Sequence, residues 1–137
     1  SAKITNTFMI QSLGELNGTH WAFKNYELSP VETAYENVID MHFFGYSENN
    51  IRFEGNNVVN SYAGSFTIDQ QNGLLIERED SIASLAGGLN EGDMDVEHQY
   101  LARLLQANYF VIKGNELLLY LGDPNAKDTE IMRFIKK

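Results

Sequence analysis

Alternation of apolar and polar residues dominates this chain. Short runs rich in aromatic and β-branched residues alternate with the period of two that is typical of half-buried strands, and glycine and asparagine separate many of them. The pattern predicts eight strands. They cover residues 20–28, 38–44, 51–54, 64–69, 74–77, 109–113, 116–121 and 130–135.

Short polar connections join several of these runs. Residues 69–73 and 113–115 have the glycine and asparagine content of hairpin turns, where a positive φ must be adopted at little cost. Strands joined by such short turns run antiparallel. The expected sheet is therefore an antiparallel meander.

One segment, residues 95–108, has a different period. Its apolar residues recur at spacings of three and four, as on one face of a helix. They are Val96, Tyr100, Leu101, Leu104 and Leu105. We expect Asp93 or Asp95 to cap the start of this helix. A helix of about three turns is not stable alone in water, so it must pack against the sheet.

The fold class predicted from these elements is mainly β (α+β): an antiparallel meander or barrel-like curved sheet of about eight strands with one α-helix packed on it. The length of 137 residues is enough for one domain. We expect residues 1–15 to form an N-terminal arm or an extra strand and residues 16–137 to form the single domain. The glycine-rich residues 84–92 are expected to form a mobile loop.

The overall charge narrows the classes of partner. Lysine and arginine total 10 against 19 aspartates and glutamates, so the formal net charge is −9. Binding to nucleic acids or anionic membranes depends on basic side chains, so neither partner is expected. No apolar run approaches the roughly 20 residues that span a bilayer, and the absence of cysteine excludes disulfides and thiol nucleophiles.

Many of the acids fall within residues 77–97, which hold seven acids and one base. The pattern predicts an acidic surface that is solvated, meets a basic partner or loosely holds a divalent cation. Its candidate residues are Glu91, Asp93, Asp95 and Glu97. Residues 93–97 resemble the start of a calcium loop but lack its glycine and closing glutamate, so we expect no metal site and no cofactor.

The sequence offers no spacing that marks a catalytic site. His20, His42 and His98 are far apart along the chain, and only the fold could bring two of them together. Neither a nucleophile elbow nor a phosphate-binding glycine loop is present. We therefore expect no catalytic residues and no enzymatic activity.

The order of several motifs extends over most of the chain. Residues 16–21 read Leu-Asn-Gly-Thr-His-Trp, residues 60–66 read Asn-Ser-Tyr-Ala-Gly-Ser-Phe, and a glutamate-containing helix and a closing hairpin follow. This order resembles the META domain, the family of HslJ-like proteins of bacterial envelopes. The family's two cysteines correspond here to Val59 and approximately Gly87, so a function that needs a thiol pair is excluded.

The resemblance implies a small antiparallel barrel-like domain with one helix, of a family without an established catalytic activity. It also implies a role in stress response or envelope maintenance, in a periplasmic or outer-membrane-associated lipoprotein whose lipid anchor would lie upstream of Ser1. Some family-motif residues are assigned structural or ligand-lining roles. They are Trp21, Asn60, Ser61, Tyr62, Gly64 and Phe66.

Three functions remain open from the sequence. The first is a non-enzymatic cell-envelope domain that binds a protein or an envelope component. The second is a carrier of a small apolar ligand or lipid, held between sheet and helix, because small-molecule pockets are mostly apolar. The third is a hydrolase whose carboxylates converge only in the folded chain.

Overall fold

The computed structural model describes residues 12–69, 73–78 and 91–137. Eight strands form one antiparallel sheet in the order β5-β4-β3-β2-β1-β8-β7-β6. Within these residues, the prediction of eight strands and one α-helix is confirmed, with boundaries that shift by a few residues. The elements are η1 (Leu13–Leu16), β1 (His20–Tyr26), η2 (Thr33–Tyr35), β2 (Asp40–Ser47), β3 (Asn50–Asn56), β4 (Ser61–Asp69), β5 (Gly73–Arg78), α2 (Asp93–Leu104), β6 (Tyr109–Lys113), β7 (Glu116–Tyr120) and β8 (Ile131–Lys136).

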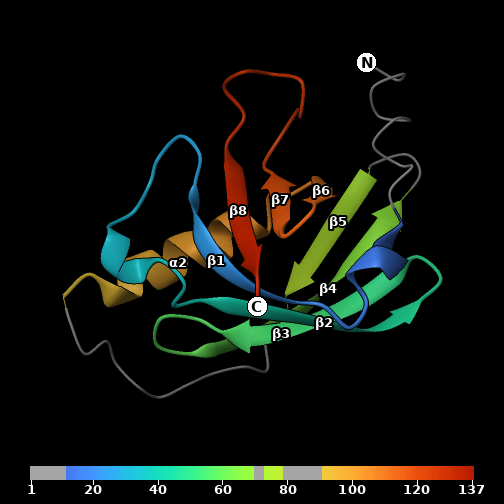
Figure 1. Cartoon of the computed structure of the whole chain (residues 1–137), viewed down its shortest axis with the longest axis horizontal. Coiled ribbons are helices and arrows are strands. Elements are labelled where there is room, and N and C mark those ends of the chain that lie inside the picture. Colours follow the sequence, from blue (N-terminus) through green and yellow to red (C-terminus); the bar gives the residue numbers. More distant parts are fainter. Residues whose placement is uncertain (1–11, 70–72, 79–90) are drawn as a thin grey trace.

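The sheet curls into a half-barrel. Figure 1 shows β2, β3 and β4 along its base, with β6, β7 and β8 standing across them and α2 lying behind β1. The edge strands β5 and β6 approach each other, and the Leu74 N–H donates to the Asn108 carbonyl oxygen at 3.2 Å. The C-terminal strand β8 pairs with β1, so the two ends of the domain meet in the middle of the sheet.

Aromatic side chains fill the inside of the curl. Alternate strand residues point inward, and the rings of Phe43 and Phe53 lie 5.0 and 5.3 Å from that of Phe66. Tyr100 of α2 closes over them, with its ring 5.2 Å from that of Phe23. Because these side chains occupy the space between the sheet and α2, the packing does not support a carrier that holds an apolar ligand there.

Helix α2 forms as predicted, but its buried face differs from the predicted apolar stripe. The buried residues are Asp93, Glu97, Tyr100 and Leu104, whereas Leu105 is 43% exposed. The predicted capping is also wrong. Gly92, at φ 93°, is the N-cap residue and no side chain caps the helix, because the Asp93 carboxylate accepts a hydrogen bond from the Tyr35 hydroxyl at 2.8 Å instead.

The N-terminal segment is described from Ser12 onward. Residues 12–16 are not a strand: η1 begins with a capping box between Ser12 and Glu15, and it buries Leu13 and Leu16 in the core. Residues 1–11 of the predicted arm, and residues 84–90 of the predicted mobile loop, lie outside the described residues. In the described part of the chain, no helix has the length and hydropathy required to cross a membrane.

Candidate functional site

A small cleft lies beside the hairpin that joins β3 and β4. Its volume is about 300 Å³, and it is lined by Glu54, Gly55, Asn56, Ser61 and Tyr62. A carboxylate, an amide and a hydroxyl therefore meet at its surface. The volume falls at the lower end of the range for small-molecule sites, about 300–1,000 Å³.

The turn of this hairpin is held in place by Glu97 of α2. One carboxylate oxygen accepts the backbone N–H groups of Val59 and Asn60, each at 2.8 Å. The other accepts the Asn60 side-chain amide at 2.5 Å. Glu97 is only 2% exposed, and these N–H donors take the place of water around its carboxylate. Because they belong to the turn, the helix fixes the shape of the turn.

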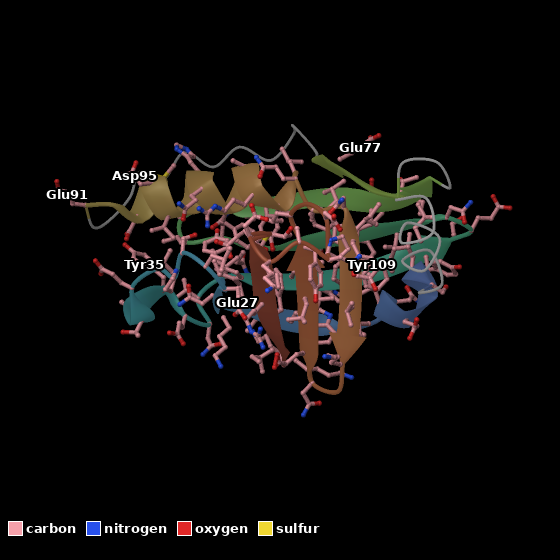
Figure 2. The ribbon with its side chains drawn as sticks, turned by 90° about the horizontal axis from the view of Figure 1, so that it is seen from above. Glu27, Tyr35, Glu77, Glu91, Asp95 and Tyr109 are labelled. Carbon is pink, nitrogen blue, oxygen red and sulfur yellow. The ribbon has the colours of Figure 1, made fainter. Side chains whose placement is uncertain are left out.

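The predicted acidic surface is therefore partly wrong. Asp93 and Glu97 are buried, because nearby O–H and N–H donors satisfy their carboxylates. Glu91 and Asp95 are exposed, and Figure 2 shows them at the N-terminal end of α2, with Glu77 apart from them, beyond the opposite end of the helix. The described acids of residues 77–97 thus form no single patch, and Glu79 and Asp80 lie outside the described residues.

Two polar atoms of the turn have no hydrogen-bond partner among the described residues. They are Nδ2 of Asn57 and Oδ1 of Asn60, and both are buried. Asn57 is 5% exposed, and its own Oδ1 accepts the Val58 N–H at 2.8 Å. Buried polar atoms are rarely left without a partner, so the turn keeps one donor and one acceptor unused.

Below the cleft, a buried pair of tyrosines links the hairpin to α2 and β2. The Tyr62 and Tyr100 hydroxyls are 2.6 Å apart, and the Tyr62 hydroxyl donates to the Asp40 carbonyl oxygen at 2.6 Å. Burial raises the pKa of both tyrosines well above the ordinary value. Both side chains are therefore neutral hydrogen-bonding groups at physiological pH.

The outer face of the sheet beside the cleft brings two histidines together. His20 of β1 is the register partner of His42 of β2, and their ring centroids are 5.7 Å apart. The Asp40 carboxylate lies 3.5 Å from both His20 Nε2 and Lys137 Nζ. His98 is exposed on α2, apart from this pair.

The family-motif residues separate into two groups. Trp21, Gly64 and Phe66 are buried within the sheet, where Trp21 donates its indole N–H to the Thr19 hydroxyl at 2.7 Å. Ser61 and Tyr62 line the cleft, and Asn60 lies in the turn beside it. Sequence reasoning did not find Glu54 or Asn56, since no motif marks an exposed polar residue at the end of a strand.

The cleft lacks the arrangement expected of a carboxylate-based hydrolase. Glu54 is the single acid that lines it. Asp40, the nearest acid of β2, accepts the Asn56 N–H at 2.8 Å and lies beside His20 and Lys137. A general acid and base pair requires two carboxyl groups that face one substrate, and the described cleft offers one.

The family model of the META domain matches residues 14–136, a range that includes the cleft, the hairpin turn and α2. The chain belongs to the META domain family. Among solved structures, the crystal structure of a DUF4847 family protein from Bacteroides vulgatus ATCC 8482 is similar, with a TM-score of 0.54 and 13% identity, over 88% of this chain and 93% of that chain. At that identity the likeness shows the fold alone. A comparison with curated proteins gives no match.

Proposed function

We propose that this META domain is a non-enzymatic domain of the bacterial cell envelope, and that it binds a protein or an envelope component at the cleft beside the β3–β4 hairpin. The observation that carries the proposal is the cleft itself, where Glu54, Asn56 and Ser61 are exposed while Glu97 fixes the neighbouring turn from below. A site held rigid before binding loses less entropy when a ligand arrives.

The chemistry of the lining indicates the kind of group that would bind. The Glu54 carboxylate accepts hydrogen bonds, while the Ser61 hydroxyl and the Asn56 amide both donate and accept them. This combination suits a segment that carries hydroxyl or amino groups. Peptidoglycan fragments carry both groups and are therefore the probe of choice.

The binding experiment titrates soluble peptidoglycan fragments into the isotope-labelled chain and follows backbone amide shifts by NMR. We expect saturable shifts at Glu54, Asn56 and Ser61, and their loss in a Glu54→Gln/Ser61→Ala variant. Glu48→Gln is the matched control, because Glu48 is exposed at the turn between β2 and β3, at the opposite end of β3. Shifts that do not saturate, or that persist in the double variant, would contradict binding of these fragments at the cleft.

The absence of catalysis is tested separately. The purified chain is incubated with generic ester, phosphate and glycoside substrates, and no turnover above background is expected. The single cleft carboxylate and the neutral Tyr62 support this expectation. Turnover that Glu54→Gln abolishes would favour the hydrolase in place of the binding domain.

An envelope location is part of the same proposal. Family membership supports a periplasmic or outer-membrane-associated lipoprotein with a role in stress response. Metabolic labelling of the full precursor with a fatty acid, followed by membrane fractionation, checks the location and the anchor. Recovery of unlabelled protein in the cytoplasmic fraction would contradict it.

A further inference from the structure

We propose that the outer face of β1 and β2 carries a binding site for a divalent first-row transition-metal ion such as zinc, with His20, His42 and Asp40 as its protein ligands. The site lies beside the cleft and does not depend on the binding role proposed there. No sequence spacing marks it, because the two histidines come from different strands. Imidazole is the commonest side-chain ligand for such ions.

The distance between the histidine rings fits one shared ion. Two imidazoles on a tetrahedral ion, with metal–nitrogen bonds of about 2.0–2.1 Å, have ring centroids about 5 Å apart. The rings of His20 and His42 are 5.7 Å apart and are tilted by 51° to each other. Register partners in an antiparallel sheet project from the same face, so rotations of exposed side chains can turn a nitrogen of each ring toward a common point.

Asp40 supplies the third ligand. Its Oδ2 lies 3.5 Å from His20 Nε2, close to the separation of about 3.3 Å between two ligand atoms on one tetrahedral ion. Its Oδ1 accepts the Asn56 N–H at 2.8 Å, which holds the carboxylate in position. Supporting hydrogen bonds of this kind orient metal ligands in proteins. Water would fill the fourth position.

The described residues contain no group of three ligand side chains already gathered around one point. His42 must therefore turn toward the pair formed by His20 and Asp40. Lys137 competes for the same carboxylate, with its Nζ 3.5 Å from Asp40 Oδ2, and binding displaces this ammonium group. Glu54, the register partner of His42 on β3, adds a negative charge on the same face, which favours a cation.

The experiment is calorimetric titration of zinc chloride into the untagged full chain after treatment with a chelator. We expect one ion per chain. His20→Ala and His42→Ala should each weaken binding by at least about tenfold, a loss that removal of a supporting contact already causes at metal sites. Asp40→Asn should also weaken binding, since it keeps the acceptor for the Asn56 N–H and removes the charge.

Two controls make the outcome specific. His98→Ala should leave the affinity unchanged, because His98 is exposed on α2. Lys137→Gln should strengthen binding, because it releases the Asp40 carboxylate from the ammonium group. Histidine ring signals in NMR spectra should shift with zinc for His20 and His42 and remain in place for His98. Equal effects of the three histidine variants, or binding of magnesium as tight as that of zinc, would overturn the site.

Discussion

Gly55 allows the backbone of β2 to approach the hairpin closely. A Cβ atom at this position would lie 2.0 Å from the Asp40 carbonyl oxygen, the same atom that accepts the Tyr62 hydroxyl. That carbonyl is backbone and cannot turn aside. The glycine is therefore required by packing rather than by an unusual φ.

The first prediction is that Gly55→Ala destabilises the domain. Forcing a methyl group into this contact should lower the free energy of unfolding by about 1–3 kcal/mol, the usual cost of overpacking. Urea unfolding followed by Trp21 fluorescence measures it. Gly14→Ala is the control, because a Cβ there would lie 3.3 Å from Ser12 Oγ and 3.4 Å from the Tyr46 ring, which are side-chain rather than backbone contacts. Equal losses in the two variants would contradict the close contact at Asp40.

The second prediction concerns Glu97. Glu97→Gln keeps the shape of the side chain but replaces one acceptor oxygen by an N–H donor, which must face a donor of Val59 or Asn60. The variant should lower the free energy of unfolding by about 1–3 kcal/mol, the cost of leaving buried hydrogen-bonding groups unpaired. Asp95→Asn, exposed on the same helix, should cost less than about 1 kcal/mol. Unfolding curves of both variants decide between a buried structural role and a surface role.

Single residues show where sequence reasoning succeeds and where it fails. Trp21 and Phe66 lie in alternating runs, and their inward direction follows from the period of two. Glutamate is usually exposed. Glu97 is buried because its carboxylate accepts the N–H groups of residues 59 and 60, which are distant in sequence. Periodicity cannot place such partners, so sequence alone predicts both Glu97 and Asp93 to lie on the surface.

At the scale of elements, α2 is attached to the rest of the domain at both ends and at its centre. Asp93 accepts the Tyr35 hydroxyl at the start, and Glu97 holds the hairpin turn. Near the end, the Arg103 guanidinium lies 4.3 Å from the centroid of the Tyr26 ring and donates to the Ser29 hydroxyl at 2.9 Å. Polar contacts thus supplement a narrow apolar face.

The third prediction is that Arg103→Met loosens the C-terminal end of α2. The variant keeps much of the apolar part of the Arg103 side chain but loses the charge above Tyr26 and the contact with Ser29. The free energy of unfolding should fall by about 1–2 kcal/mol. Lys24→Met, an exposed residue of β1, is the control and should change stability by less than about 0.5 kcal/mol. Thermal unfolding monitored by circular dichroism compares the two. A similar change in both would show that Arg103 acts only as a surface charge.

The fourth prediction follows from Glu130, which joins β8 to the loop after β1. Desolvation alone would raise the pKa of this carboxyl, but hydrogen bonds from Ser29, Leu28 and Ile131, together with the Arg103 charge, lower it overall. A lowered pKa in the folded state contributes stability that is complete above the ordinary glutamate range and is lost as the pH falls through the folded value. Glu130→Gln should therefore be less stable than the parent chain at pH 7.

The same comparison is repeated by urea unfolding as the pH is lowered from 7 toward 3. The difference between the parent chain and Glu130→Gln should narrow as the parent carboxyl becomes protonated. A difference that stays constant across this range would show that the carboxylate charge contributes nothing, and that the effect comes from the shape of the side chain.

At the scale of the whole molecule, local and distant pairings differ in how well sequence predicts them. The turn composition of residues 69–73 and 113–115 indicates the antiparallel pairs of β4 with β5 and of β6 with β7. The pairing of β1 with β8 joins opposite ends of the chain, and no turn composition indicates it. The curl depends on this distant pairing, and the turn beside the cleft is held by Glu97 of α2. Neither contact can be predicted from local sequence.

The last prediction concerns the seam between the edge strands. The Leu74 N–H points away from β4 toward β6 and bonds the Asn108 carbonyl oxygen. Because successive N–H groups of a strand alternate in direction, the Ile76 N–H points to the same side. If the half-barrel is open beyond this contact, the Leu74 amide should exchange with deuterium more slowly than the Ile76 amide. The amides of β1, which pairs with both β2 and β8, should be slower than either.

Amide exchange followed by NMR at neutral pH gives this comparison residue by residue. Protection of Ile76 equal to that of Leu74 would mean that a continuous ladder joins β5 and β6, and the domain would then be a closed barrel in solution. Fast exchange at both residues would mean that the seam opens readily. The interior would then be accessible from that side, although the aromatic side chains would still occupy the space that an apolar ligand would need.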